Sequence, residues 1–129
     1  MTQFNSTSMT LAGTGLLVCF GQTALAQEAP LAPVASPEVY KVLAENDQWR
    51  VIEATWAPGQ QDAMHSHPAD RVSLYVTDCH LLITTADGSS REGKPKAGAV
   101  RVISGAPVAA HIAKNIGDSP CVIRIVELK

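Results

Sequence analysis

The sequence predicts an all-β domain, either a sandwich or a barrel. Short segments rich in Val, Ile, Thr and aromatic residues recur along the chain, and turns containing Gly, Pro, Asn and Asp separate them. Beyond the N-terminal region no stretch shows the 3.6-residue spacing of apolar side chains that an amphipathic helix needs. A chain of 129 residues has the length of one domain. We therefore expect a single β domain of seven or eight short strands.

Residues 1–26 have the layout of a secretory signal peptide. They contain no Asp, Glu, Lys or Arg, carry an apolar run over 9–20, and end in Ala24-Leu25-Ala26, with small residues where a signal peptidase reads. No Lys or Arg precedes the run, which leaves a disordered N-terminus or a membrane anchor as alternatives. The run is shorter than the roughly 20 apolar residues of a spanning helix. We expect cleavage after Ala26 and a periplasmic or secreted protein.

Residues 27–37 (QEAPLAPVASP) hold three prolines and predict an extended linker. The β domain is expected over 38–129. Strands are predicted over 39–43, 49–57, 71–77, 80–85, 99–103, 108–113 and 121–128, and a polar loop over 88–97. The last strand is apolar on both faces apart from Arg124 and Glu127, so we expect both faces to be covered. That pattern suggests a homodimer.

The charge of the chain bears on its binding partners, and its cysteines bear on a possible disulfide. The net charge is −2 and its signs are mixed, so no cluster of Lys and Arg indicates binding to nucleic acid or to an anionic membrane surface. Cys79 and Cys121 remain after removal of the signal peptide. A disulfide between them is one alternative in an oxidising compartment, but sequence does not place their Cα atoms within reach of each other. We interpret them as buried free thiols.

The residues with obvious chemistry lie in the segment 59–71 (GQQDAMHSHPADR). His65 and His67 would project from the same side of a strand, about 7 Å apart. A third imidazole, from His111 on another strand, would complete three positions of a divalent metal site. The alternative is three histidines held by hydrogen bonds without a metal. His80 lies outside this pattern and is interpreted as an ordinary polar strand residue.

These histidines resemble the ligands of the cupin family. Gly59-x5-His65-x-His67 matches the opening of the first cupin motif, G-x5-H-x-H-x3/4-E-x6-G, and His111-x3-Asn115 matches the close of the second. The resemblance covers about 39–129 and is to small single-domain bacterial cupins. It implies a single cupin-type jelly-roll β-barrel with the histidines facing its interior. Some three-His cupins are thiol or diketone dioxygenases, so it also makes an oxygenase conceivable.

The chain departs from the first motif at two positions. The motif's Glu falls at Arg71 or Val72, and its closing Gly falls near residues 78–79, where there is none. The fourth ligand is therefore unassigned, and Asp70 and Gln60 are candidate oxygen ligands. The expected cofactor is a divalent transition metal, with Fe, Zn, Ni and Mn as candidates.

Arg71 has two interpretations. If strand alternation continues through Pro68, Arg71 points inward with the histidines and binds a substrate carboxylate. If Pro68 shifts the alternation of side chains by one residue, Arg71 lies on the surface.

Three function classes remain open for the chain: a metal-dependent enzyme acting on a small organic molecule (an oxygenase, isomerase or hydrolase), a non-catalytic small-ligand-binding module, and a degenerate cupin.

Overall fold

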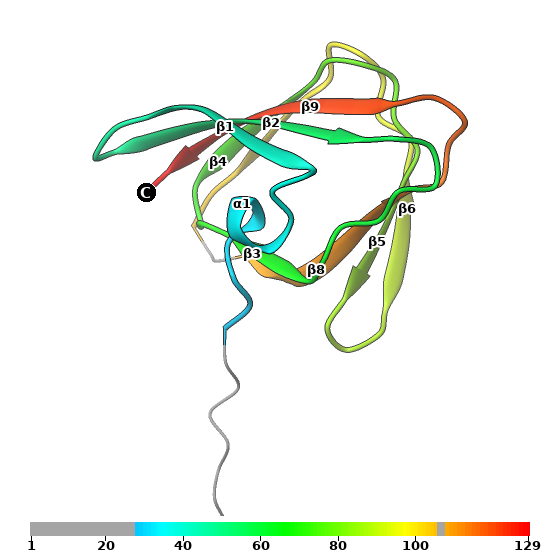
Figure 1. Cartoon of the computed structure of the whole chain (residues 1–129), viewed down its shortest axis with the longest axis horizontal. Helices are drawn as coiled ribbons and strands as arrows, with labels where there is room; N and C mark the ends of the chain where they lie inside the picture. Colours follow the sequence, from blue (N-terminus) through cyan, green and yellow to red (C-terminus); the bar gives the residue numbers. More distant parts are fainter. Residues whose placement is uncertain (1–27, 106–107) are drawn as a thin grey trace, which may run out of the picture.

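The computed structural model describes residues 28–105 and 108–129 and has the all-β jelly-roll architecture that the sequence predicts (Figure 1). The expected signal peptide, residues 1–26, lies outside the described residues. The described strands are β1 (Tyr40–Glu45), β2 (Trp49–Trp56), β3 (His65–His67), β4 (Arg71–Tyr75), β5 (Leu81–Thr85), β6 (Ser90–Gly93), β7 (Val100–Ile103), β8 (Val108–Asn115) and β9 (Cys121–Leu128).

Two antiparallel sheets enclose the interior of the barrel. One sheet has the order β1-β2-β9-β4-β7 and the other the order β3-β8-β5-β6. The last strand thus lies between β2 and β4, and it pairs with β2 without a break from Trp49↔Leu128 to Trp56↔Cys121. In Figure 1, β1, β2 and β9 lie across the interior from β3 and β8. Segments far apart in the chain are therefore brought to one cavity.

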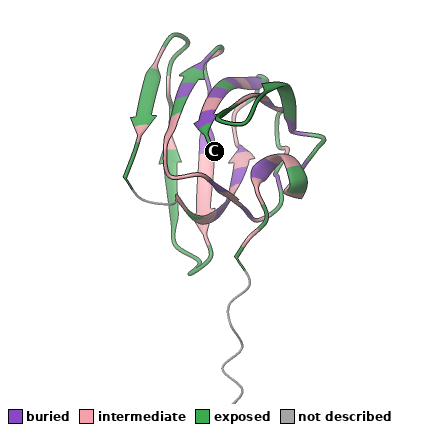
Figure 2. Ribbon diagram, turned by 90° about the vertical axis from the view of Figure 1, so that its left-hand side faces the viewer, coloured by how far each residue is buried: buried purple, intermediate pink, exposed green. Residues whose placement is uncertain are grey.

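Alternation along the strands builds the core. In β2 the side chains of Ile52, Ala54 and Trp56 are buried, and in β9 those of Ile123 and Ile125 are buried opposite them. Figure 2 shows this alternation as purple segments between pink and green ones. Each fully buried large apolar side chain contributes about 1.5–3 kcal/mol relative to its exposed state. The strands predicted over 49–57 and 121–128 therefore supply the core with alternate, inward-facing residues.

The segment 88–97 was predicted to be a polar loop, but four of its residues, Ser90–Gly93, form strand β6. The prediction is wrong for that part. Its residues pair with β5, with Ile83 opposite Arg91, after a turn at Gly88 with φ +85°. β6 is the edge of its sheet and its side chains are mostly exposed. An edge strand needs few apolar side chains, which is why composition alone missed it.

The segment predicted as an extended linker also differs in its second half. Ala32–Ala35 form one turn of helix, α1, and Ala32 is fully buried. The hydroxyl of Ser36 accepts a hydrogen bond of 2.8 Å from the backbone N–H of Ala63 and fixes the turn to the chain leading into β3. Proline is tolerated in the first turn of a helix, so a Pro-rich composition did not exclude this helical turn.

Within the described ranges no helix is long and apolar enough to cross a membrane.

Within one chain, the last strand is covered on its inner face. Its inward residues are buried, whereas Arg124 and Leu128 are exposed. On the neighbouring strands, Val102 is 73% exposed and lies opposite Val72, which is also exposed. The homodimer suggested by this strand stays a prediction.

Cys79 and Cys121 form a disulfide, so the interpretation as free thiols is wrong. Their Cα atoms lie 4.9 Å apart, and both side chains are buried. Cys79 follows β4 and Cys121 begins β9, 42 residues later. Pairing of β4 with β9 brings the two cysteines together, which the sequence could not show.

Candidate metal centre

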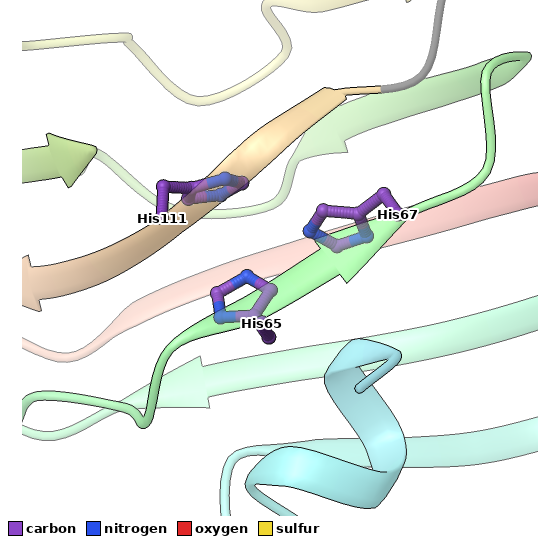
Figure 3. A group of neighbouring side chains, drawn as sticks. All are labelled: His65, His67 and His111. Atoms are coloured by element: carbon purple, nitrogen blue, oxygen red, sulfur yellow. The ribbon is translucent and has the colours of Figure 1, made fainter. Parts of the chain in front are cut away.

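Three histidines converge inside the barrel (Figure 3). His65 and His67 lie on β3, and His111 lies on β8 directly opposite His65 in the strand pairing. Ser66, between the first two, turns the other way, and its hydroxyl donates a 2.7 Å hydrogen bond to the carbonyl of Ala29. One potential ligand atom from each histidine lies within 4.8 Å of the others. The structure thus brings together the three residues that the sequence singled out.

Hydrogen bonds on the outer ring nitrogens orient all three imidazoles. The Nδ1 atoms of His65 and His111 lie 2.8 and 2.9 Å from the carbonyl oxygens of Ala63 and Ala109. Nδ1 of His67 lies 2.7 Å from a carboxylate oxygen of Glu127. Because each partner is an acceptor, each Nδ1 carries the proton and leaves the lone pair on Nε2. This is how ligand histidines are held and polarised around metal ions in proteins.

The electrostatic setting keeps the three rings neutral. Burial lowers the pKa of all three imidazoles, and the positive charge of Arg71 lowers the pKa of each further. A neutral imidazole is the form that binds a metal. The donor set, three oriented nitrogens without a carboxylate among them, suits Fe, Zn, Ni or Cu better than Mg or Ca. The residues present therefore fit a transition metal ion.

Two buried carboxylates that the sequence analysis did not identify support this cluster. Glu127 is 1% exposed and binds His67, as described, while its other oxygen has no hydrogen-bond partner among the described residues. Asp62 is 3% exposed and accepts hydrogen bonds from the backbone N–H of Ala113, the Tyr40 hydroxyl and the Trp56 indole. Burial raises the pKa of both carboxyl groups.

Tyr40 connects one of these carboxylates to the histidines. Its hydroxyl oxygen lies 2.7 Å from Asp62 and 3.1 Å from Nε2 of His65. Burial raises the pKa of Tyr40 well above its ordinary value, so the phenol stays protonated. A hydroxyl has one proton and serves one of these two acceptors at a time. Tyr40 therefore places a hydroxyl oxygen beside Nε2 of His65, the nitrogen left for a metal.

Local motifs could not reveal Glu127 or Asp62 as partners of the histidines. Glu127 is 60 residues from His67 in sequence, and it lies on β9 of one sheet while His67 lies on β3 of the other, so the two meet only across the interior of the folded barrel. One signal was available: Glu127 continues the inward series of Cys121, Ile123 and Ile125 at period 2. A carboxylate on the core face of a strand needs a buried partner.

The other candidate ligands lie away from the cluster. The carboxylate of Asp70 accepts a 3.1 Å hydrogen bond from the N–H of Gly105. The side-chain oxygen of Gln60 accepts one of 2.9 Å from the N–H of Ala57. Nε2 of His80 lies 3.0 Å from a carboxylate oxygen of Glu92, on the β5–β6 side of the barrel. No fourth protein ligand from Asp70 or Gln60 joins the three histidines.

Arg71 faces the interior, beside the histidines. It lines a cavity of about 260 Å³ together with His67 and His111. Its Nε and Nη1 atoms are buried and have no hydrogen-bond partner among the described residues. The sequence analysis explained an inward Arg71 by strand alternation that continues through Pro68. That explanation does not hold, because β3 and β4 belong to different sheets. Arg71 points inward because it shares the inner face of β4 with Ser73 and Tyr75.

Replacing Glu127 with Gln tests the support of His67. The amide still offers an oxygen to Nδ1 but removes the negative charge that raises the basicity of the ring. We expect the metal affinity to fall about 10- to 100-fold, measured by competition with a chromogenic chelator. Glu53→Gln is the matched control, because Glu53 forms an ion pair with Arg124 on the outer face of the barrel. Equal affinities of the two variants would contradict this role of Glu127.

Comparison with known proteins identifies the fold. No protein-family model matches the sequence, and no curated protein matches it. Among solved structures, a cupin domain from Bordetella pertussis matches with a TM-score of 0.62 and 25% identity, over 79% of this chain and 97% of that chain. A cupin-like protein from Thermotoga maritima matches with a TM-score of 0.51 and 21% identity, over 68% and 65% of the two chains.

A third similar structure extends the likeness beyond bacteria. It is an RmlC-like cupin family protein with a double-stranded β-helix fold from Methanocaldococcus jannaschii, with a TM-score of 0.54 and 13% identity. The match covers 70% of this chain and 78% of that chain. The chain therefore has the cupin fold, and the similarity to the cupin domain from Bordetella pertussis, which is 25% identical, supports the cupin superfamily.

Proposed function

We propose that this protein is an exported metal-binding cupin that holds one divalent transition metal ion on His65, His67 and His111. The observation that carries the proposal is the common orientation of the three rings, each with its Nδ1 proton on a protein acceptor and its Nε2 lone pair left for a ligand. Three nitrogen ligands leave coordination positions open for water or a small molecule.

The cavity beside the histidines is the proposed site for a small organic molecule. A bound metal ion would act there as a Lewis acid or redox centre. Arg71 supplies a buried guanidinium whose Nε and Nη1 atoms have no hydrogen-bond partner among the described residues, and we propose that it binds a carboxylate of the molecule. Apolar walls, including Trp56, Ile83 and Ile125, take the carbon skeleton. This arrangement supports an enzyme of the oxygenase, isomerase or hydrolase class as well as a non-catalytic binding module, and O2 uptake or product formation with metal-loaded protein distinguishes them.

Added metal is expected to stabilise the folded protein. A ligand that binds only the native state at 100 times its Kd adds about 2.7 kcal/mol to the free energy of unfolding. The measurement is thermal melting of untagged protein with Fe(II), Zn(II), Ni(II) or Mn(II), compared with a variant carrying alanine at 65, 67 and 111. Stabilisation confined to the wild-type protein supports the proposal. The same shift in both proteins, or none in either, would count against it.

Export is proposed from the N-terminal segment, and the disulfide supports it. Structural disulfides persist in oxidising compartments such as the periplasm and are rare in the cytosol. The pairing of Cys79 with Cys121 suits such a compartment. We expect the chain recovered from the periplasm or medium of an expressing bacterium to begin at Gln27, which N-terminal sequencing tests. Recovery of the chain from the cytosol alone, with residues 1–26 intact, would contradict export.

A further inference from the structure

The cavity next to the three histidines is lined by three arginines and, among the described residues, by no Asp or Glu. Arg71, Arg91 and Arg101 all contribute to its walls. Much of the remaining lining is aliphatic or aromatic, with Ser73 and Thr85 as small hydroxyl groups. Three permanent positive charges around one cavity of about 260 Å³ create a field that favours an anionic ligand.

Strand pairing explains how the arginines come together. Arg101 on β7 lies opposite Ser73, and Arg71 lies two residues before Ser73 on the same inner face of β4. Arg91 comes from the other sheet, where it lies opposite Ile83 on β5. Both β6 and β7 are edge strands of their sheets. Arg91 and Arg101 are exposed, whereas two guanidinium nitrogens of Arg71 are buried. The cavity thus has one arginine deep beside the histidines and two at its solvent-exposed edges.

None of the three guanidinium groups is neutralised by an ion pair among the described residues. The arginines that do have carboxylate partners there are Arg50 and Arg124. Glu127 lies opposite Arg71 in the pairing of β9 with β4, yet its carboxylate binds His67 instead. Burial lowers the pKa of Arg71, and the positive charge of Arg101 lowers it further, whereas the negative charge of Glu127 raises it. A buried cation without an ion-pair partner is costly, so a bound anion would stabilise the site.

We propose that the ligand is a small organic dianion with two acidic groups on one short carbon skeleton. One carboxylate binds Arg71 beside the histidines, and the second acidic group binds Arg91 and Arg101 at the opening. The apolar walls between them hold the skeleton. This inference rests on the proposed small-molecule site, but it does not require a particular metal or reaction.

The test is calorimetric titration of the metal-free, disulfide-intact protein at low ionic strength. The probes are succinate, glutarate and adipate, each compared with its monomethyl ester, which keeps one carboxylate and the carbon chain. We expect at least one diacid to bind about tenfold more tightly than its monoester, since a hydrogen-bonded charge pair contributes that much. The double variant Arg91→Gln/Arg101→Gln is expected to lose this difference and to bind the monoester as before.

Two further variants keep the result interpretable. Arg71→Gln should weaken the binding of diacid and monoester alike. Lys41→Gln/Arg124→Gln removes two positive charges outside the cavity lining and should leave the diacid preference unchanged. Thermal melting of each variant checks its folding. Higher salt should reduce the diacid preference, because exposed charges are screened within about 8–10 Å at physiological ionic strength.

The inference is overturned if no diacid binds the wild-type protein, if each diacid and its monoester bind equally, or if the preference survives in the Arg91/Arg101 double variant. Metal binding measured on separate portions of the same protein preparations, without diacid, separates this failure from failure of the proposed metal site. A protein that binds a metal ion without any diacid preference keeps the proposed function and loses only the dianion.

Discussion

Replacing His111 with alanine is expected to lower the affinity for a transition metal at least about 100-fold. His111 is one of three imidazole ligands and comes from β8, opposite His65 on β3. Removing a partner that only supports a ligand already costs about 10- to 100-fold, so the loss of a ligand itself should cost at least as much. The affinity is measured by competition with a chelator of known strength, and metal content is measured after gel filtration.

His80→Ala is the matched control for this variant. His80 is a histidine of the same domain that pairs with Glu92 and lies outside the cluster. We expect its metal affinity to equal that of the wild-type protein. Circular dichroism of both variants shows whether the barrel remains folded. An unchanged affinity in folded His111→Ala protein would show that this imidazole binds no metal.

Removal of the disulfide is expected to cost about 4 kcal/mol of stability, from the entropy of closing a loop of this length. Cys79 and Cys121 are separated by 42 residues and join the chain after β4 to the start of β9. The measurement is urea unfolding of the double variant Cys79→Ala/Cys121→Ala against the oxidised wild-type protein.

Reduced wild-type protein provides the control for the disulfide. It should resemble the double variant, and a reductant should not change the variant itself. A difference in unfolding free energy below about 1 kcal/mol between oxidised protein and variant would contradict the prediction. It would show that the cysteines add little to the restraint already given by pairing of β4 with β9.

Strands rich in β-branched and apolar residues could be predicted from the sequence because turns containing Gly, Pro, Asn and Asp separate them. β2 and β9 are examples. β6 could not be read, since an edge strand with polar side chains looks like a loop. The turn of helix at Ala32–Ala35 was missed because its stability depends on contact with the barrel, such as the Ser36–Ala63 hydrogen bond, and not on local propensity.

The residues of the candidate site likewise fall into those that the sequence could identify and those that it could not. His65 and His67 are adjacent on one strand and carry a spacing that identifies them, and His111 has its own short motif. Glu127, Asp62 and Tyr40 carry no such spacing, because they meet the histidines only in the folded barrel, Glu127 and Tyr40 from the facing sheet and Asp62 from the loop before β3. The inward orientation of Arg71 was expected, but for a reason that does not hold. The side chain points inward because Arg71 lies on the inner face of β4, and not because the alternation of β3 continues into β4.

Metal analysis of the untagged mature chain tests the central claim most directly. Protein is exposed in turn to Fe(II), Zn(II), Ni(II) and Mn(II), freed of excess metal, and analysed by mass spectrometry for bound metal per chain. We predict one equivalent of at least one of these metals in the wild-type protein and none in the variant with alanine at His65, His67 and His111. Wild-type protein that retains no metal, or a folded triple variant that retains as much, would contradict the claim.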